Sequence, residues 1–234
     1  MRSEGGGQIR GLVVAIDGPA GVGKSTLARA LARELRLPYV NTGLMYRALA
    51  GRSREAGVDP GDEIRLVELA RTMTFSLDAG DPLELSIDGR APAASLSSPE
   101  VEAVVSAVAR HPSVRALMRA AQRELGLGGS VMEGRDIGTV VFPDADLKFY
   151  LDASDEERGL RRYRQLRGRG EPAVLAEIVA EIEERDRRDR SRAHSPLRCA
   201  PDAERVDTTL LSMEEVVALL LERCRQRLRR PQKP

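Results

Sequence analysis

The fold of this chain is decided by the stretch Gly18-Pro19-Ala20-Gly21-Val22-Gly23-Lys24-Ser25-Thr26, which follows the apolar run Leu12-Val13-Val14-Ala15-Ile16. The spacing Gly-x-x-x-x-Gly-Lys-Ser between a strand and a helix is typical of a loop that cradles phosphates, because glycines let several backbone N–H groups converge on one anion. We expect the residues of this loop to bind the nucleotide, with Lys24 reaching the β- and γ-phosphates and the Ser25 hydroxyl binding Mg²⁺. A chance match in a glycine-rich turn is the alternative, which the flanking strand and helix disfavour. The sequence therefore predicts binding of a nucleoside triphosphate.

Composition favours a single α/β domain with insertions as the organisation of the 234 residues. The net charge is only +1 although 31% of the residues are charged, so no global field indicates nucleic acid or an anionic membrane as a partner. Cys199 and Cys224 lie far apart without a neighbouring cysteine or histidine cluster, which predicts neither a zinc site nor a disulfide framework. Any binding of phosphates must therefore depend on local groups of basic residues.

The sequence gives no sign of a membrane or export segment. No apolar stretch has the length of a membrane span, and the opening Met1–Gly7 is not followed by the apolar core of a signal sequence. We therefore expect a cytoplasmic protein with neither a membrane nor a nucleic acid as partner. Residues 1–10 are expected to be a flexible lead-in, and residues 11–234 a single domain that is monomeric.

Apolar strands alternate with amphipathic helices along most of the chain, which predicts a central parallel sheet with helices on its faces. Strands are expected near residues 12–17, 38–40, 130–133, 147–151 and 205–209. Helices are expected from Thr26 to about Leu35 and near residues 43–56, 62–72, 98–110, 112–125, 177–190 and 213–228. The predicted fold class is α/β, with the three layers of a P-loop nucleoside triphosphatase.

Two segments depart from this alternation. Residues 73–77 and 83–87 flank a turn-rich loop and predict an antiparallel hairpin, so we expect an inserted subdomain, roughly residues 60–105, with a small antiparallel sheet. Residues 155–172 predict a helical lid that closes on the triphosphate through a basic run containing Arg158, Arg161, Arg162, Arg164 and Arg167. A helix that faces nucleic acid or only solvent is the alternative for this run, because it lacks interleaved stacking aromatics.

Three clusters downstream of the phosphate loop combine guanidinium groups with carboxylates or amides. They are Asn41–Arg47, Glu133–Pro143 and Glu184–Arg192. Joining two phosphate-bearing reactants requires this combination, because planar Arg side chains neutralise phosphates and bind two oxygens at once. Each cluster also has an ordinary structural explanation. In chain order these are a helix cap with a solvated Arg, a turn with a surface ion pair and a solvated helix face.

Together these motifs resemble those of the bacterial cytidylate kinases, a family of P-loop kinases that phosphorylate CMP and dCMP with ATP. The resemblance runs from about Leu12 to the end of the chain and is carried by Ile16–Thr26, Asn41–Arg47, Glu133–Ala145 and Glu184–Arg190. Many kinases share the phosphate loop, whereas the other three motifs in this order are specific. The resemblance implies direct in-line transfer of the γ-phosphoryl from MgATP to the 5′-phosphate of CMP or dCMP, without a phosphoenzyme.

The resemblance also implies an acceptor pocket built by residues from all three clusters and from the segment between them. For the cytosine ring these are Ser106, Arg115 and Asp136; for the acceptor phosphate Arg47, Arg135 and Arg192; for the sugar Arg185 and Asp189; and Thr42 and Tyr46 complete the pocket. Lys24 and Arg135 would be catalytic, aided by the lid arginines and by Mg²⁺ held partly by Ser25. Asp136 could accept the amine of cytosine, whereas uracil would present an acceptor to that carboxylate.

The chain departs from the family pattern at two places. Asn41 stands where Asp is usual, which removes a negative charge near the phosphates, and residues 96–101 lack an Arg that the family carries there. Two other functions are the alternatives: a P-loop kinase of another acceptor such as UMP, AMP or shikimate, and a nucleotide switch or nucleic-acid-binding protein without catalysis. The second alternative leaves Arg47, Arg135 and Asp189 without a shared purpose.

Overall fold

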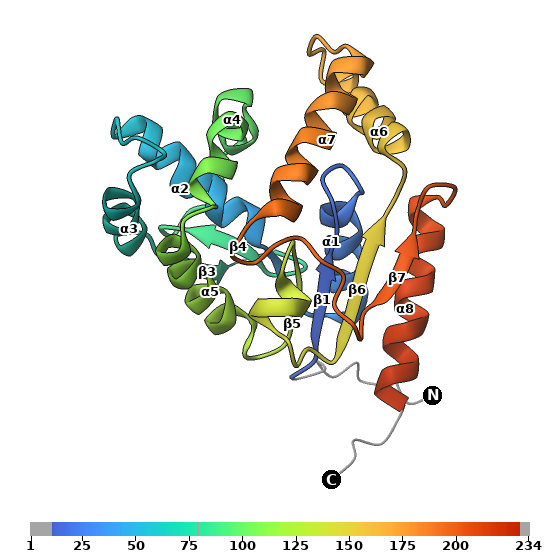
Figure 1. Ribbon diagram of the computed structural model, residues 1–234. Coiled ribbons are helices and arrows are strands. Elements are labelled where there is room, and N and C mark those ends of the chain that lie inside the picture. The colour runs from blue at the N-terminus through green and yellow to red at the C-terminus, as the bar shows by residue number, and fades with distance from the viewer. Residues whose placement is uncertain (1–10, 79, 230–234) are drawn as a thin grey trace.

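The computed structural model describes residues 11–78 and 80–229, and within them a seven-stranded sheet has the order β3-β4-β2-β5-β1-β6-β7 (Figure 1). The strands are β1 (Val13–Asp17), β2 (Tyr39–Asn41), β3 (Phe75–Asp78), β4 (Glu84–Ile87), β5 (Ser130–Gly134), β6 (Leu147–Asp152) and β7 (Glu204–Asp207). The α-helices are α1 (Lys24–Leu35), α2 (Thr42–Glu55), α3 (Glu63–Arg71), α4 (Pro99–Val108), α5 (Pro112–Gly126), α6 (Asp155–Gly168), α7 (Leu175–Ser191) and α8 (Met213–Arg229). A 3₁₀ turn, η1 (Ala94–Ser97), and a π-helical turn, η2 (Ile137–Val141), complete the described elements.

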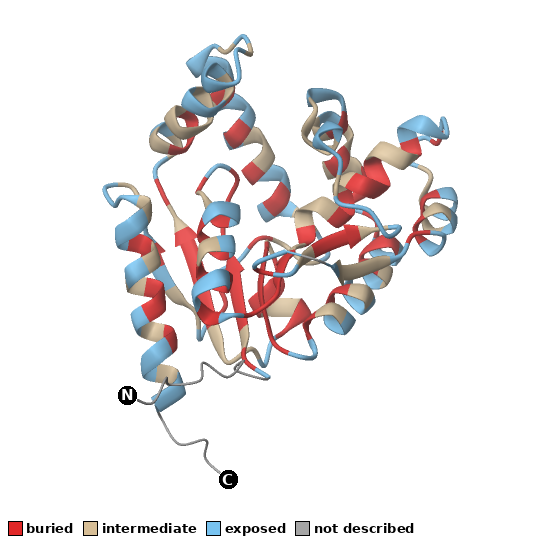
Figure 2. Ribbon diagram, turned by 180° about the vertical axis from the view of Figure 1, so that it is seen from behind, coloured by how far each residue is buried: buried red, intermediate tan, exposed pale blue. Residues whose placement is uncertain are grey.

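The central strands β1 and β5 are buried along most of their length because both of their faces are covered. Successive residues of β1 point to opposite faces, so Ile16 packs in one core cluster and Ala15 in another. The cluster around Ile16 is closed by α1 and α8, whereas the one around Ala15 is closed by η2. Figure 2 shows the buried residues concentrated in these strands and on the helix faces next to them.

A separate core supports the helices that follow β2. It joins α2, α3, α4 and α5 through buried side chains such as Met45, Leu49, Leu66, Val105 and Met118. This packing fixes the orientation of α2, α4 and α5, which carry many of the residues expected to bind the acceptor. On the other side of Figure 1, α6 and α7 form a helical pair beyond the ends of the strands, and α7 returns beside the loop after β1.

The structure confirms the α/β fold class, and the expected hairpin is present as the antiparallel pair β3–β4. The small antiparallel sheet expected within residues 60–105 is this hairpin, and β4 also pairs in parallel with β2, which adds the hairpin to the main sheet. The Tyr39 N–H donates to the carbonyl of Leu83 at 2.8 Å, so the hairpin satisfies backbone groups that β2 would otherwise expose.

Local signals in the sequence account for most helix boundaries. Ser154 accepts a hydrogen bond from the Glu157 N–H at the start of α6, and Pro112 occupies the first turn of α5. Within the described ranges, no helix combines the length and the apolar character needed to cross a membrane. The flexible lead-in expected for residues 1–10 lies outside the described residues.

Candidate active site

The carboxyl ends of three neighbouring parallel strands bring the predicted motifs to one edge of the sheet. Asp17 at the end of β1 lies in register with Gly134 of β5, and Asn41 of β2 with Glu133. Ligands of open α/β sheets bind at this edge. A Cβ on Gly134 would lie 2.7 Å from the Thr42 hydroxyl, so glycine is required for the two segments to approach.

The phosphate loop joins β1 to α1, and one of its carbonyl groups accepts a hydrogen bond from Lys24 at the start of α1. The Lys24 ammonium is 6% exposed and donates a hydrogen bond of 2.6 Å to the carbonyl of Pro19. Burial, followed by the positive charge of Arg135, lowers the pKa of Lys24 well below its usual range. Gly18 has φ +153° and a Cβ there would meet the Leu151 carbonyl at 2.2 Å, so only glycine begins this turn. A bound phosphate would stabilise the charged form of Lys24, which burial and the nearby Arg135 disfavour.

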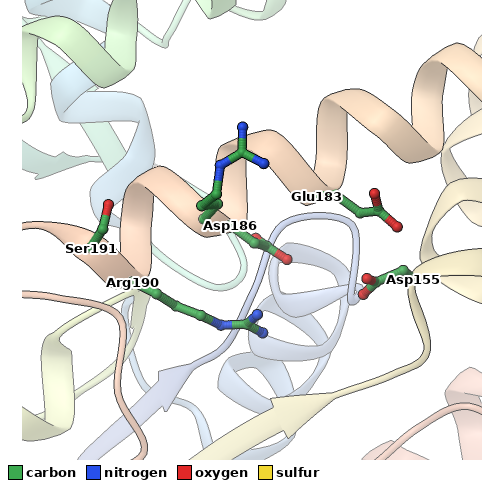
Figure 3. A pocket seen from close by; sticks show the side chains of 6 residues that line it. Asp155, Glu183, Asp186, Arg190 and Ser191 are labelled. Carbon is green, nitrogen blue, oxygen red and sulfur yellow. The ribbon is translucent and has the colours of Figure 1, made fainter.

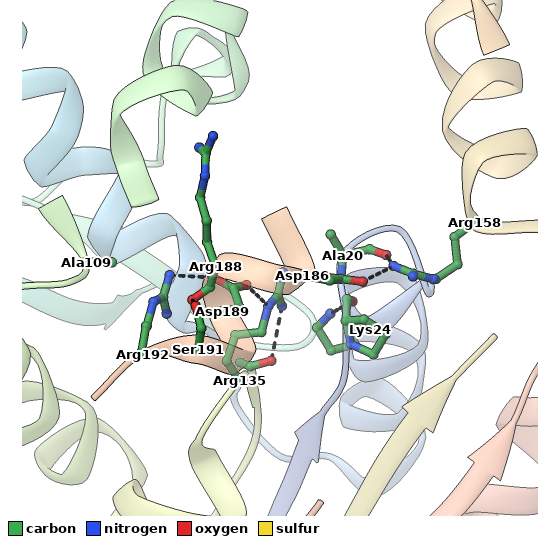
Figure 4. Close-up of polar contacts among 12 residues, drawn as sticks. Ala20, Lys24, Ala109, Arg135, Arg158, Asp186, Arg188, Asp189, Ser191 and Arg192 are labelled. Atoms are coloured by element: carbon green, nitrogen blue, oxygen red, sulfur yellow. Dashed lines mark hydrogen bonds and ion pairs between the residues drawn. The ribbon is translucent and has the colours of Figure 1, made fainter. Parts of the chain in front are cut away.

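Residues of two predicted clusters meet at Asp189 on α7. Arg135 Nε donates to one carboxylate oxygen of Asp189 at 2.9 Å, and Arg192 donates to the other oxygen (Figure 4). Burial alone would raise the pKa of Asp189, but Arg135 and Arg192 outweigh it and lower the pKa. The carboxylate therefore holds two guanidinium groups in place beside the end of β5.

A second buried pair joins α5 to the segment after β5. Arg115 donates to Asp136 at 2.6 Å and to the carbonyl of Ala109 at 3.1 Å, and its guanidinium lies 5.4 Å from the centre of the Tyr46 ring. Burial raises the pKa of Tyr46 to about 12. The Nε atoms of Arg47 and Arg115 are buried without a hydrogen-bond partner in the part of the chain that the structure describes. Such donors are unfavourable unless a ligand or water satisfies them.

The acceptor helices also contribute a carboxylate that the sequence analysis missed. Glu102 on α4 places one oxygen 3.5 Å from Arg47 on α2 and the other 3.5 Å from Arg162 on α6. Nothing in its local sequence distinguishes this glutamate from the solvated acidic residues of an ordinary helix. Burial, followed by the charges of Arg135 and Arg47, lowers the pKa of Arg185 to about 10, so this region gathers more positive than negative charge.

The remaining predicted acceptor residues are near these groups but have fewer polar contacts. The Thr42 hydroxyl donates to the carbonyl of Glu133 at 2.7 Å, which fixes it beneath the pocket. Ser106 is half-buried on α4. Glu133, quoted in the second cluster but given no role, is buried and accepts a hydrogen bond of 2.6 Å from Tyr39. A charged residue at the buried end of a strand was the signal that could have identified it.

The predicted lid arginines divide by burial into three groups: one is buried, two are half-buried and two are exposed. Arg158 is 1% exposed and fully engaged with protein partners, so the expectation that its side chain closes on the triphosphate does not fit this arrangement. Arg161 donates to the carbonyl of Thr208 at 2.6 Å and to the Glu157 carboxylate at 2.9 Å. Arg162 is half-buried beside Glu102, whereas Arg164 and Arg167 are exposed. The burial of Arg158 follows from its position in the first turn of α6, against the phosphate loop.

The fold and these residues define a P-loop phosphotransferase, with a donor loop and a second, arginine-rich group of side chains at one edge of the sheet. Comparison with known proteins narrows this class. The sequence profile of the cytidylate kinase family matches residues 14–226. The chain therefore belongs to the cytidylate kinase family.

Individual relatives agree with this assignment. The chain is 43% identical over 221 residues to a cytidylate kinase of Geobacter sp. (strain M21), which covers 93% of this chain and 94% of that one. It is 46% identical over 220 residues to a cytidylate kinase of Solibacter usitatus (strain Ellin6076), with the same coverage. It is 47% identical to a bifunctional pantoate ligase/cytidylate kinase of Synechococcus sp. (strain JA-2-3B'a(2-13)), covering 93% of this chain but 41% of that protein. A solved shikimate kinase from Acinetobacter baumannii is 14% identical with a TM-score of 0.45, covering 94% and 96% of the two chains.

Proposed function

We propose that this protein transfers the γ-phosphoryl group of ATP directly to the 5′-phosphate of CMP and dCMP. One observation carries the proposal beyond family membership: Arg135, which Asp189 holds on the acceptor side, directly follows β5 beside the end of β1, and Figure 4 shows it near Lys24 of the donor loop. The two groups therefore act on one space, where the terminal phosphate of the donor and the phosphate of the acceptor would meet.

The acceptor pocket suits a cytosine base. Asp136 and Arg115 form a buried pair that offers a carboxylate for the exocyclic amine and a guanidinium for the ring acceptors, with Ser106 on the neighbouring helix. The buried unpartnered Nε of Arg115 is a donor that such a base can satisfy. Uracil would place a carbonyl opposite the Asp136 carboxylate, which costs about 1–3 kcal/mol.

The phosphate and sugar of the acceptor would be held by groups from separate elements. Arg47, Arg135 and Arg192 would bind the phosphate, and Arg185 with Asp189 the sugar hydroxyls. Burial, and after it the positive charge of neighbouring arginines, lowers the pKa values of Arg185 and Arg192, so a bound anion would be favourable here. Positioning and charge neutralisation are what in-line phosphoryl transfer requires of a protein, because no covalent nucleophile takes part.

Magnesium fits the donor side. The exposed Ser25 hydroxyl interacts with the hydroxyl of Tyr39, which donates to the Glu133 carboxylate, so the ion would meet the oxygen ligands that it prefers. Ser25 would hold Mg²⁺, which supplies neutralisation of the triphosphate charge. Lys24 would exchange the Pro19 carbonyl for phosphate oxygens, and the exposed lid arginines Arg164 and Arg167 would approach the triphosphate as the lid excludes water.

An acceptor screen tests this function. ADP release is measured with MgATP and each of CMP, dCMP, UMP, AMP and shikimate, in parallel with a reaction that contains no acceptor. We expect rapid release with CMP and dCMP and slow release with the others. A preference for UMP or AMP would assign a different monophosphate kinase, and release that does not depend on any acceptor would contradict the proposal.

A further inference from the structure

A buried ion pair between α6, the predicted lid helix, and α7 holds one residue of the phosphate loop by both of its backbone polar groups. Arg158 of α6 and Asp186 of α7 form a hydrogen bond of 2.5 Å. Asp186 accepts the N–H of Ala20 at 3.0 Å, and Arg158 donates to the carbonyl of Ala20 at 2.7 Å. Figure 4 shows Ala20 between the two side chains. The backbone N–H and carbonyl of Ala20 are therefore both hydrogen-bonded to side chains of α6 and α7.

The pair is completely removed from solvent, with Arg158 1% and Asp186 2% exposed. Arg158 Nε also donates to the Ala153 carbonyl at 3.2 Å, and its remaining nitrogen pairs with Asp155. Burying two charges is costly, and a buried pair often adds little stability compared with apolar side chains of similar size. What the pair does provide is a fixed orientation for the groups that it contacts, which include Ala20 of the phosphate loop.

Packing independently ties the same part of the loop to the same helices. A Cβ on Gly21 would lie 3.3 Å from both Cβ and the carbonyl of Arg158, and 3.4 Å from Ile182 of α7. A cavity next to this contact is lined by Asp155, Glu183, Asp186, Arg187, Arg190 and Ser191 (Figure 3). The tip of the loop therefore lies in close contact with both α6 and α7.

We infer that Arg158 and Asp186 are positioning residues that set the shape of the phosphate loop for ATP and couple it to α6 and α7. Because Asp186 already binds the Ala20 N–H, this amide is withheld from the nucleotide, and the phosphates are bound by the amides that follow it. Arg158 acts through the loop and does not contact the transferred phosphoryl group. The inference rests on the proposed function only in taking ATP as the donor.

Three variants test the inference: Arg158→Lys, Asp186→Asn and the double variant. The dissociation constant of MgATP is measured without acceptor, together with kcat and the KM of CMP, below the unfolding temperature of each variant. We expect ATP binding to weaken by about tenfold in each single variant, because each substitution weakens a charge-assisted hydrogen bond that orients the loop. The double variant should be no weaker than the singles, and the KM of CMP should change little. Arg188→Lys, which breaks an exposed ion pair with Glu184 on the same helix, is the matched control and should bind ATP normally.

A measurement on the unaltered protein keeps the test independent of folding in the variants. We expect the Ala20 amide to be protected from hydrogen exchange before ATP is added and to be unchanged by it, whereas amides of residues 21–26 gain protection. Rapid exchange of the Ala20 amide in the free protein would overturn the inference. So would unchanged ATP binding in folded variants, or a fall in kcat alone in Arg158→Lys, which would make Arg158 catalytic. An unexpected result in the acceptor screen would leave these outcomes untouched, since ATP binding is measured without acceptor.

Discussion

At the scale of single residues, the donor side depends on a lysine that the protein holds in an unfavourable state. The Lys24 ammonium is buried, its pKa is lowered first by burial, and its hydrogen bond is to a carbonyl of its own loop. A triphosphate offers this cation the negative charge that the carbonyl does not. The lysine is thus placed to stabilise charge that develops on the phosphates.

Replacing this lysine should abolish activity and leave the fold intact. In Lys24→Ala we expect kcat to fall by about 10³-fold, because one preorganised cation is lost from the transition state. The melting temperature should change little even though activity is lost, since the substitution removes a buried charge rather than an apolar side chain of the core. Steady-state kinetics and thermal unfolding of the same preparation check both parts, and retained turnover in a folded variant would refute the role of Lys24.

A single carboxylate should decide the choice of base. In Asp136→Asn the new amide can donate to the carbonyl of uracil but no longer accepts as a carboxylate from the amine of cytosine. We expect the ratio of kcat/KM for CMP over UMP to fall by about 10- to 100-fold. Glu204→Gln, which weakens an exposed ion pair with Arg223, is the control and should leave the ratio unchanged. An unaltered ratio in Asp136→Asn would remove Asp136 from base recognition.

At the scale of secondary-structure elements, Asp17 connects the end of β1 with the turn that follows β5. Its carboxylate accepts the N–H groups of Ile137 at 2.9 Å and Gly138 at 2.7 Å, at the start of η2. The turn directly follows Arg135 and Asp136, so this contact holds the acceptor segment against the start of the phosphate loop. Asp17 lies within the motif Ile16–Thr26, but its contact with the start of η2 was not predicted from the sequence.

The titration of Asp17 predicts a pH dependence of stability. Burial, partly offset by the two backbone hydrogen bonds, raises the pKa of Asp17 from 3.8 to about 6. The folded protein therefore holds this proton more tightly than the unfolded chain, and the resulting stabilisation is complete below the unfolded pKa and is lost as the pH rises through the folded pKa. The change amounts to about 3 kcal/mol in the free energy of unfolding.

Urea unfolding of the protein and of Asp17→Asn at about pH 4 and about pH 7.5 measures this contribution. The amide that replaces the carboxylate in this variant does not titrate, so the difference between the two proteins cancels the other ionisable groups. We expect the unaltered protein to lose stability relative to the variant as the pH rises, with most of the change between pH ~4 and ~6. A difference that is constant with pH would show that burial does not shift the pKa of Asp17.

At the scale of the whole molecule, Glu102 links the helices that carry the acceptor site to the lid. Its carboxylate lies between Arg47 and Arg162, two cations that would otherwise repel each other. Glu102 forms an ion pair with Arg47, whose guanidinium is proposed to bind the acceptor phosphate. Under the proposed function, Glu102 would compete with the acceptor phosphate for Arg47.

Removing this competitor should tighten acceptor binding. In Glu102→Gln we expect the KM of CMP to fall by about 3- to 5-fold, since partly exposed ion pairs of this kind contribute up to about 1 kcal/mol. The ATP dissociation constant should change less. Glu100→Gln, on the first turn of the same helix, is the matched control. A higher KM of CMP in Glu102→Gln would mean that the glutamate orients Arg47 for the acceptor instead of competing with it.

The sequence by itself determined the parts of this protein that depend on neighbouring residues. The spacing from Gly18 to Ser25 requires a particular backbone path, and the apolar runs of β1 and β5 identify buried parallel strands, because such patterns reflect local conformation and burial. The order of the clusters after that loop also indicated the family. The hairpin β3–β4 was also predicted, but its parallel pairing with β2 was not, because that pairing joins segments far apart in the sequence.

Only the tertiary structure decided which charged side chains meet. Arg158 looked like a mobile lid arginine from its basic neighbours, yet packing of α6 and α7 against the loop buries it with Asp186. Glu102 has an unremarkable local sequence, and its contact with Arg162 arises only where α4 and α6 approach. The physical reason is that a buried charge needs a partner of opposite charge. In this protein the partner lies far away in the sequence, and only packing of the helices brings the two side chains together.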